Sequence, residues 1–189
     1  MFTRKLAVVV IQLLLILLLT SCGYHFGTGS TINSYRTISV PYVEGDWDGT
    51  ITSAIIKEIS EYTSLAYRDC GGALILKVKV LDYDDENIGF RYDRKKDGNP
   101  KDIIIPDETR TSIRAEVVVI EASSGCNILG PVEIFADVEY DHDYYSNRDA
   151  INVFSLGQLS DIDEAYDAAQ QPLNKRLAEK IVAYVRDNW

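Results

Sequence analysis

Residues 73–83 read Ala-Leu-Ile-Leu-Lys-Val-Lys-Val-Leu-Asp-Tyr, a stretch in which aliphatic and charged side chains alternate. Successive side chains of a β-strand point to opposite faces, so this order predicts a strand with one buried face and one solvated face. Lys77 and Lys79 lie on the solvated face. The predicted buried face carries Leu74, Leu76, Val78 and Val80. The rest of the chain must therefore supply partner strands and a second layer that covers this face.

Two later stretches, residues 111–121 and 128–140, alternate in the same way and predict two more strands. Their predicted inward residues are Ile113, Ala115, Val117 and Val119 in the first and Val132, Ile134, Ala136 and Val138 in the second. Ser123-Ser124-Gly125 marks the turn between them, so we expect two antiparallel hairpins. A first strand is expected over residues 36–43, where Pro41 favours a sheet edge or a strand end.

The segment between the second and third strands is ambiguous. The acidic residues at 82–86 end the regular alternation, whereas Ile88, Phe90 and Tyr92 indicate that an extended arm continues. We expect a charged loop over residues 91–101 that turns at Gly98-Asn99-Pro100. A loop of this length in a compact domain is usually functional or disordered.

Two helices complete the pattern. Apolar residues recur at helical spacing from Ile51 to about Thr63, with Asp48 as the expected N-cap, and a second apolar stripe runs from Asp161 towards the C-terminus. We expect Pro172 to kink or divide this second helix, and residues 149–159 to form a weak helix or a lead-in. The order βαβββα predicts an α+β fold: a four-stranded mixed sheet with two helices packed on one face.

The N-terminus predicts export and lipid attachment. Residues 1–5 are basic, residues 6–19 are apolar, and Leu19-Thr20-Ser21-Cys22-Gly23 resembles the lipobox of bacterial lipoproteins. The apolar run is shorter than the roughly 20 residues that span a bilayer, although an uncleaved anchor is the alternative. We therefore expect a signal peptide over residues 1–21, acylation of Cys22, a tether over residues 22–35, and a single domain over residues 36–189. In the lipoprotein family an Asp after the Cys retains the protein at the inner membrane, so Gly23 implies the periplasmic face of the outer membrane.

The net charge limits the possible partners. The chain carries a formal net charge of −10, and cleavage before Cys22 would remove two of its cations, Arg4 and Lys5. An acidic surface argues against nucleic acid and against docking on anionic lipid by charge alone. Membrane contact should then come from the acyl chains or from a protein partner.

Two cysteines remain beside Cys22. If the strands at 73–83 and 111–121 pair with Val78 opposite Val119, extending this register brings Cys70 within about a residue of Cys126. An exported chain meets an oxidising compartment, so we expect a Cys70–Cys126 disulfide, with two buried free thiols as the alternative.

The sequence contains little that suggests catalysis. The chain has two histidines, His25 and His142, and no phosphate-binding loop, dinucleotide glycine motif or HExxH motif. The oxygen-rich cluster Asp137, Glu139, Asp141, His142 and Asp143 is expected to form a solvated strand face rather than a metal site. We expect a protein without enzymatic activity, cofactor or metal.

One concentration of positive charge stands out in this acidic chain. Its members are Arg91, Arg94, Lys95, Lys96 and Lys101. They form either a solvated loop or a site for phosphates or sugar acids, to which Lys and Arg donate charge-assisted hydrogen bonds.

Several stretches together resemble the LptE family of lipopolysaccharide-assembly lipoproteins. They are Cys22-Gly23-Tyr24-His25-Phe26 after the lipobox, then residues 38–43 (Ile-Ser-Val-Pro-Tyr-Val), the helix at 51–59 (Ile-Thr-Ser-Ala-Ile-Ile-Lys-Glu-Ile), and a closing helix with Glu164-Ala165 and residues 176–182 (Arg-Leu-Ala-Glu-Lys-Ile-Val). Their order along the chain carries much of the resemblance.

The resemblance implies a non-enzymatic plug inside an LptD-type β-barrel that assists the assembly of lipopolysaccharide in the Gram-negative outer membrane. A plug needs a rigid domain with a polar surface, since barrel interiors are polar. Family members are proposed to bind lipopolysaccharide through basic residues, but no motif carries those residues onto this chain, so the basic loop is assigned by its charge and position. The alternatives are another lipid-anchored adaptor, such as a barrel-assembly accessory or a secretion pilot, and a lipid-tethered hydrolase.

Overall fold

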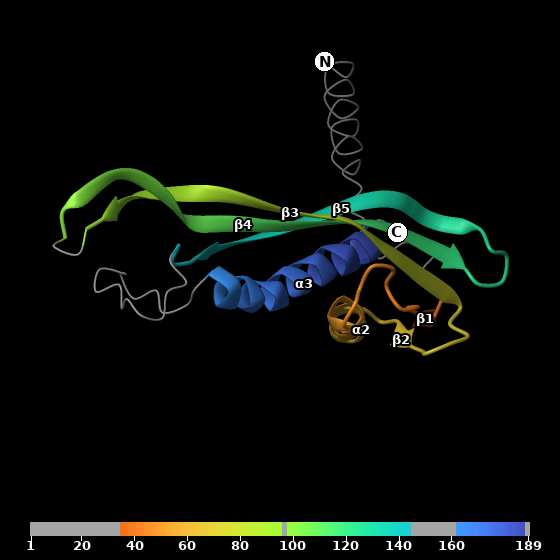
Figure 1. Ribbon diagram of the computed structural model, residues 1–189. Helices are drawn as coiled ribbons and strands as arrows, with labels where there is room; N and C mark the ends of the chain where they lie inside the picture. The colour runs from red at the N-terminus through yellow and green to blue at the C-terminus, as the bar shows by residue number, and fades with distance from the viewer. Residues whose placement is uncertain (1–34, 96–97, 145–161, 188–189) are drawn as a thin grey trace, which may run out of the picture.

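The computed structural model describes residues 35–95, 98–144 and 162–187 (Figure 1). The predicted signal peptide, Cys22, nearly all of the tether, Lys96 and the segment at 149–159 lie outside the described residues. The elements in chain order are β1 (Thr37–Ser39), α2 (Thr50–Tyr62), β2 (Ala66–Tyr67), β3 (Leu74–Arg94), β4 (Pro100–Glu121), β5 (Asn127–Asp141) and α3 (Ile162–Asp187). Within the described ranges, no helix combines the length and the apolar character needed to cross a bilayer.

A five-stranded sheet forms one layer, and both helices cover the same face of it (Figure 1). The strand order is β2-β1-β3-β4-β5; β1 runs parallel to both of its neighbours, and the remaining pairs are antiparallel. The predicted α+β class with two helices on one face is confirmed. The sheet has five strands rather than the predicted four. The additional strand, β2, has two residues, too few to produce an alternation in the sequence. We call the side of the sheet that faces away from α2 and α3 the outer face.

β3 and β4 form a hairpin much longer than the two predicted strands. The predicted strands ended near Tyr83 and began at Thr111, but the ladder continues until Arg94 pairs with Pro100. Most of the expected loop is therefore strand, and the extended arm indicated by Phe90 and Tyr92 is confirmed. The hairpin reaches past the N-terminal end of α3 (Figure 1). Register shifts interrupt the ladder at several points, which lets a long ladder bend and twist without ending.

The residues predicted to face inward build the core. Leu74, Leu76 and Val78 of β3 are buried, as are the four predicted positions of β4 and, from β5, Ile134, Ala136 and Val138. The helices cover them with Ile51, Ile55 and Ile59 from α2 and Leu173, Leu177 and Ile181 from α3. Each such aliphatic side chain contributes about 1.5–3 kcal/mol on burial. The apolar alternation therefore identifies correctly which face of the sheet the helices cover.

Helix α2 begins differently from the prediction. The N-cap is Gly49, which adopts a left-handed φ of 80°, rather than Asp48. Asp48 still serves the helix start, because its Oδ1 accepts a hydrogen bond from the Thr50 N–H at 3.0 Å. Asp46 Oδ2 accepts from the Thr52 N–H at 2.8 Å. Two carboxylates thus satisfy first-turn donors that have no partner within the helix.

Helix α3 continues through Pro172 as one element. Of the predicted kink or division, the division is therefore wrong, and the kink stays a prediction. Proline removes one backbone donor and crowds the preceding turn, which costs about 3 kcal/mol in a helix interior. Packing on both sides of it offsets this cost, since Ala169 and Leu173 are 5% and 0% exposed. The tertiary contacts hold the helix together across the proline.

The predicted register between β3 and β4 is wrong by two residues, because Val78 lies opposite Val117 rather than Val119. In addition, the ladder ends near Ala73, whose carbonyl accepts from the Ala122 N–H at 2.9 Å. Beyond that point the segment before β3 leads back to β2 at one edge of the sheet, and the segment after β4 leads into β5 at the opposite edge. Cys70 and Cys126 are accordingly free and exposed, and the predicted disulfide is not formed in this structure.

Candidate functional site

The far end of the β3–β4 hairpin carries the predicted basic residues, but the structure does not group them into one site. Arg91 points to the helix side of the sheet, where its Nη2 donates to Asp143 Oδ1 at 2.9 Å. Lys101 Nζ lies 2.6 Å from Asp93 Oδ2. Arg94 and Lys95 are exposed, and within the described ranges neither forms an ion pair. Of the predicted cluster, these two described cations are available to a ligand.

The ion pairs of Arg91 and Lys101 are structural. The side chains of Asp143 and Asp93 are only 12% and 7% exposed, so both carboxylates have lost most of their hydration. A buried carboxylate is tolerated only when a cation and hydrogen bonds compensate for that loss. Asp107 adds a second carboxylate 3.7 Å from Arg91 Nε. The Arg91–Asp143 pair joins the hairpin to the residues just after β5, across 52 residues of sequence, and no local pattern in the sequence indicates it. The Lys101–Asp93 and Arg91–Asp107 pairs join β3 to β4 within the hairpin.

His142 is fully buried beneath the same hairpin. Its Nε2 lies 2.8 Å from Thr109 Oγ1, and the Thr109 hydroxyl donates to Asn87 Oδ1 at 3.0 Å. Because the hydroxyl hydrogen is used in that second bond, the network assigns the ring proton to Nε2. The ring therefore acts as a donor that fastens the end of β5 to β4, and it has no exposed surface through which to meet a substrate.

The predicted oxygen-rich cluster is split between the two faces of the sheet. Asp137, Glu139 and Asp141 alternate on the outer face, as expected, whereas His142 and Asp143 are buried on the helix side. Among the described residues, no group of three His, Cys, Asp or Glu side chains is placed to hold a metal ion. The absence of a metal stays a prediction.

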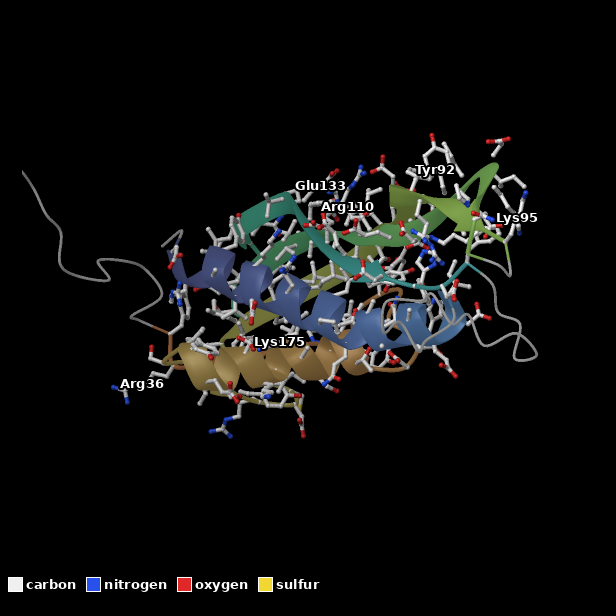
Figure 2. The ribbon with its side chains drawn as sticks, turned by 90° about the vertical axis from the view of Figure 1, so that its left-hand side faces the viewer. Arg36, Tyr92, Lys95, Arg110, Glu133 and Lys175 are labelled. Carbon is white, nitrogen blue, oxygen red and sulfur yellow. The ribbon has the colours of Figure 1, made fainter. Side chains whose placement is uncertain are left out.

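An exposed apolar patch on the outer face of the hairpin was not predicted. Phe90 pairs with Pro106 and Tyr92 with Ile104, so these four side chains lie together on that face. Phe90, Tyr92 and Ile104 are 59%, 63% and 59% exposed. Figure 2 shows Tyr92 on the side opposite the helices, with Lys95 at the nearby tip. Three consecutive isoleucines at 103–105 hide the alternation in β4, so no pattern in the sequence indicates this half of the patch.

No protein-family model matches the sequence, and no curated protein matches it. Among solved structures, rare lipoprotein B from Shewanella oneidensis superposes with a TM-score of 0.50 at 11% identity, covering 81% of this chain and 96% of that one. A minor lipoprotein from Acinetobacter baumannii gives a TM-score of 0.49 at 12% identity, covering 82% of this chain and 95% of the other. A putative lipoprotein from Caulobacter crescentus gives 0.45 at 13% identity, with 80% and 86% covered. At such low identity the likeness concerns architecture, and this chain shares the fold of rare lipoprotein B.

Proposed function

We propose that this chain is a lipid-anchored outer-membrane protein of the LptE type, which sits inside an LptD-type β-barrel and assists lipopolysaccharide assembly without catalysing a reaction. The lipobox-like sequence ending at Cys22 supports the lipid anchor. The shared fold with rare lipoprotein B supports the architecture. The buried position of His142 supports a role other than hydrolysis.

The main support for the proposal is the charged surface on the outer face of the sheet. Neither α2 nor α3 covers it, and charged side chains from three neighbouring strands lie opposite one another across it. Figure 2 shows two of them, Arg110 and Glu133. Arg110 lies between Glu139 at 2.6 Å and Glu86 at 3.9 Å. The hydrogen bond with Glu139 raises the pKa of Arg110 above its ordinary value, because the carboxylate favours the charged guanidinium.

Carboxylates outnumber cations on the described part of this face. The carboxylates are Asp82, Asp84, Glu86, Glu108, Glu116, Glu133, Asp137, Glu139 and Asp141, and the cations are Lys77, Lys79, Arg110 and Arg114. Exposed ion pairs of this kind add little to stability, so stability alone does not account for this arrangement. Contact with a partner would account for it. A broad, polar and acidic surface suits the polar interior of a barrel, especially one lined by cations.

The hairpin tip supports contact with lipopolysaccharide in this proposal. Arg94 and Lys95 offer cations to phosphate groups, and the patch of Phe90, Tyr92 and Ile104 offers apolar surface to acyl chains. Arg91 and Lys101 are excluded from this role because they already pair with carboxylates.

Site-specific crosslinking tests the barrel contact. A photo-reactive residue at Glu133, which is exposed on the outer face, should capture a large β-barrel protein in cells and in gentle detergent extracts. The matched control is Glu61, an exposed glutamate on α2, which should capture that protein much less. Equal capture from both positions, or no barrel protein from either, would contradict the proposal.

A further inference from the structure

Strand β5 forms one edge of the sheet, and α3 covers only part of that edge. The carbonyl of Phe135 accepts a hydrogen bond from Lys180 Nζ at 2.8 Å, and the carbonyl of Asp137 accepts one from Arg176 Nη1 at 2.5 Å. Unpaired backbone groups on an edge strand invite pairing with another chain, and long cationic side chains are a common protection. The two α3 residues thus protect the edge where they reach it.

The protection ends after Asp137. The His142 N–H donates to the Asp107 carbonyl at 3.0 Å, so even-numbered residues at this end of β5 direct their backbone groups to β4. By alternation, the N–H and C=O groups of Glu139 and Asp141 point away from the sheet, as the Phe135 and Asp137 carbonyls do. Within the described ranges, no group bonds to these outward backbone atoms.

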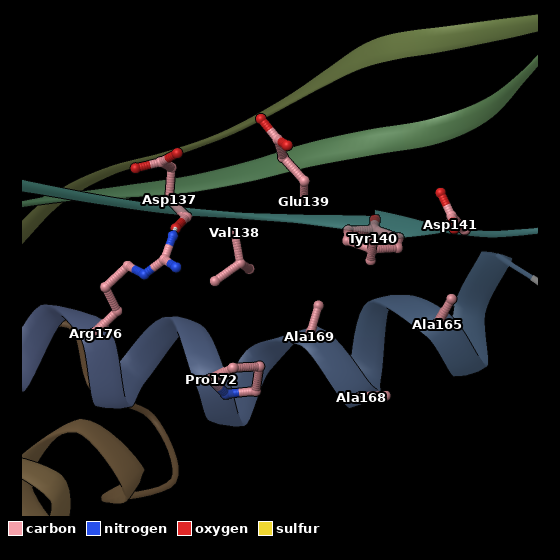
Figure 3. A pocket seen from close by; sticks show the side chains of 10 residues that line it. All are labelled: Asp137, Val138, Glu139, Tyr140, Asp141, Ala165, Ala168, Ala169, Pro172 and Arg176. Atoms are coloured by element: carbon pink, nitrogen blue, oxygen red, sulfur yellow. Dashed lines mark hydrogen bonds between the residues drawn. The ribbon is translucent and has the colours of Figure 1, made fainter.

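A cleft of about 700 Å³ lies beside this open stretch, between β5 and the first half of α3 (Figure 3). On the helix side it is lined by Ala165, Ala168, Ala169 and Pro172, and Arg176 lies at one end. These small side chains cannot reach β5 as Arg176 and Lys180 do further along, so the described residues leave a space between helix and strand. The alanines and Pro172 make the helix side of the cleft apolar, so aliphatic side chains fit against it better than charged ones.

The outward rim of the cleft is anionic. Asp137, Glu139 and Asp141 carry their carboxylates on the outer face, next to the open edge (Figure 3). Glu139 is paired with Arg110, whereas Asp137 and Asp141 form no ion pair within the described part of the chain. Cationic side chains are therefore favoured beside this rim.

We propose that the β5 edge from Asp137 to Asp141 binds an extended peptide of a partner protein by strand addition. The backbone groups of Glu139 and Asp141 would pair with the peptide backbone. Alternate peptide side chains would enter the alanine-lined cleft, and the others would lie beside the carboxylates. The fitting peptide thus alternates aliphatic residues with Lys or Arg. This inference rests neither on the lipid anchor nor on the barrel partner.

The test uses the full chain in a non-ionic detergent and a synthetic peptide, acetyl-Lys-Val-Lys-Val-Lys-Val-Lys-amide. We expect saturable binding and slower hydrogen exchange at the Glu139 and Asp141 amides. The same peptide with N-methylated valines, or with glutamate in place of lysine, should bind at least about tenfold more weakly, which corresponds to about 1.4 kcal/mol.

Two variants locate the site. Asp141→Pro removes an outward N–H, a change that an edge strand tolerates, and should abolish binding, whereas Asp141→Asn keeps that donor and should weaken binding less. Ala168→Phe should fill the cleft and also prevent binding, with Ala122→Phe in the exposed β4–β5 turn as its control. Binding that survives both Asp141→Pro and Ala168→Phe, no binding by the lysine peptide, or amides already protected in the free chain would each overturn the proposal.

Discussion

Glu58 is a carboxylate that the fold buries, with 4% of its surface exposed where α2 meets α3. Burial raises the pKa of its carboxyl group above the ordinary 4.5, and repulsion by Glu179 and Glu61 raises it further. The folded chain therefore holds this proton more tightly than the unfolded chain does. The stability that Glu58 contributes is fully present in acid and is lost as the pH rises from about 4.5 through the raised pKa.

Glu58→Gln should accordingly stabilise the protein above that pH range, since glutamine carries no charge to bury. We expect a melting temperature about 2 °C higher than wild type at pH 8, with the difference shrinking towards pH 4. Thermal unfolding followed by circular dichroism at both pH values measures this. Glu61→Gln, on the exposed side of α2, is the control and should change the melting temperature less. A lower melting temperature for Glu58→Gln at pH 8 would show that the charged form is stabilised instead.

The β3–β4 hairpin carries two kinds of cation: some form ion pairs within the fold, and others are exposed at its tip. Arg91 joins the hairpin to Asp143, and Lys101 pairs with Asp93 within the hairpin, while Arg94 and Lys95 extend from its tip. Figure 2 places Lys95 at one end of the molecule and Arg36 at the other. The hairpin therefore carries cations far from the end at which the chain enters the sheet.

Reversing the charges of the tip, with Arg94→Glu and Lys95→Glu together, should weaken binding of purified lipopolysaccharide about tenfold or more, because two phosphate-binding donors become repulsive. The matched control reverses Arg36 and Arg68, two exposed arginines at the other end, and changes the net charge equally. Binding of labelled lipopolysaccharide in detergent gives the comparison. If both double variants lose affinity equally, the effect is general electrostatics and the tip is not a site.

At the level of the whole molecule, the proposed acyl chains on Cys22 would set the location of the protein. Each buried methylene contributes about 0.8 kcal/mol, and two membrane signals already give stable anchoring. Acylated Cys22 would thus hold the acidic domain at the membrane without any contact between its surface charge and anionic lipid.

Cys22→Ala should leave an uncleaved and unlipidated precursor that is lost from the outer-membrane fraction. Intact-mass measurement and density-gradient fractionation report the two effects separately. Cys70→Ala serves as the control, because Cys70 is an exposed free thiol and its loss should alter neither processing nor location. Normal mass and fractionation of the Cys22→Ala protein would refute the lipid anchor.

The alternation in the sequence was sufficient to predict the α+β class, the helices and the buried face of the sheet. Leu74, Leu76 and Val78 illustrate why, since a period of two residues assigns each side chain to a face using only its immediate neighbours. The sequence indicated the hairpin extension beyond Tyr83 only weakly. Both strands of the extension are rich in charged residues, so few apolar residues remain to show the alternation.

Pairing between distant residues was beyond what a local pattern can specify. The predicted register set Val78 opposite Val119 and the structure sets it opposite Val117, a shift of two residues that leaves every side chain on the same face. The alternation is identical in both registers, so only the assembled sheet, with its bulges, distinguishes them. The same holds for the contact of Arg91 with Asp143 and for the open edge of β5, because each depends on how far the chain has twisted before the two segments meet.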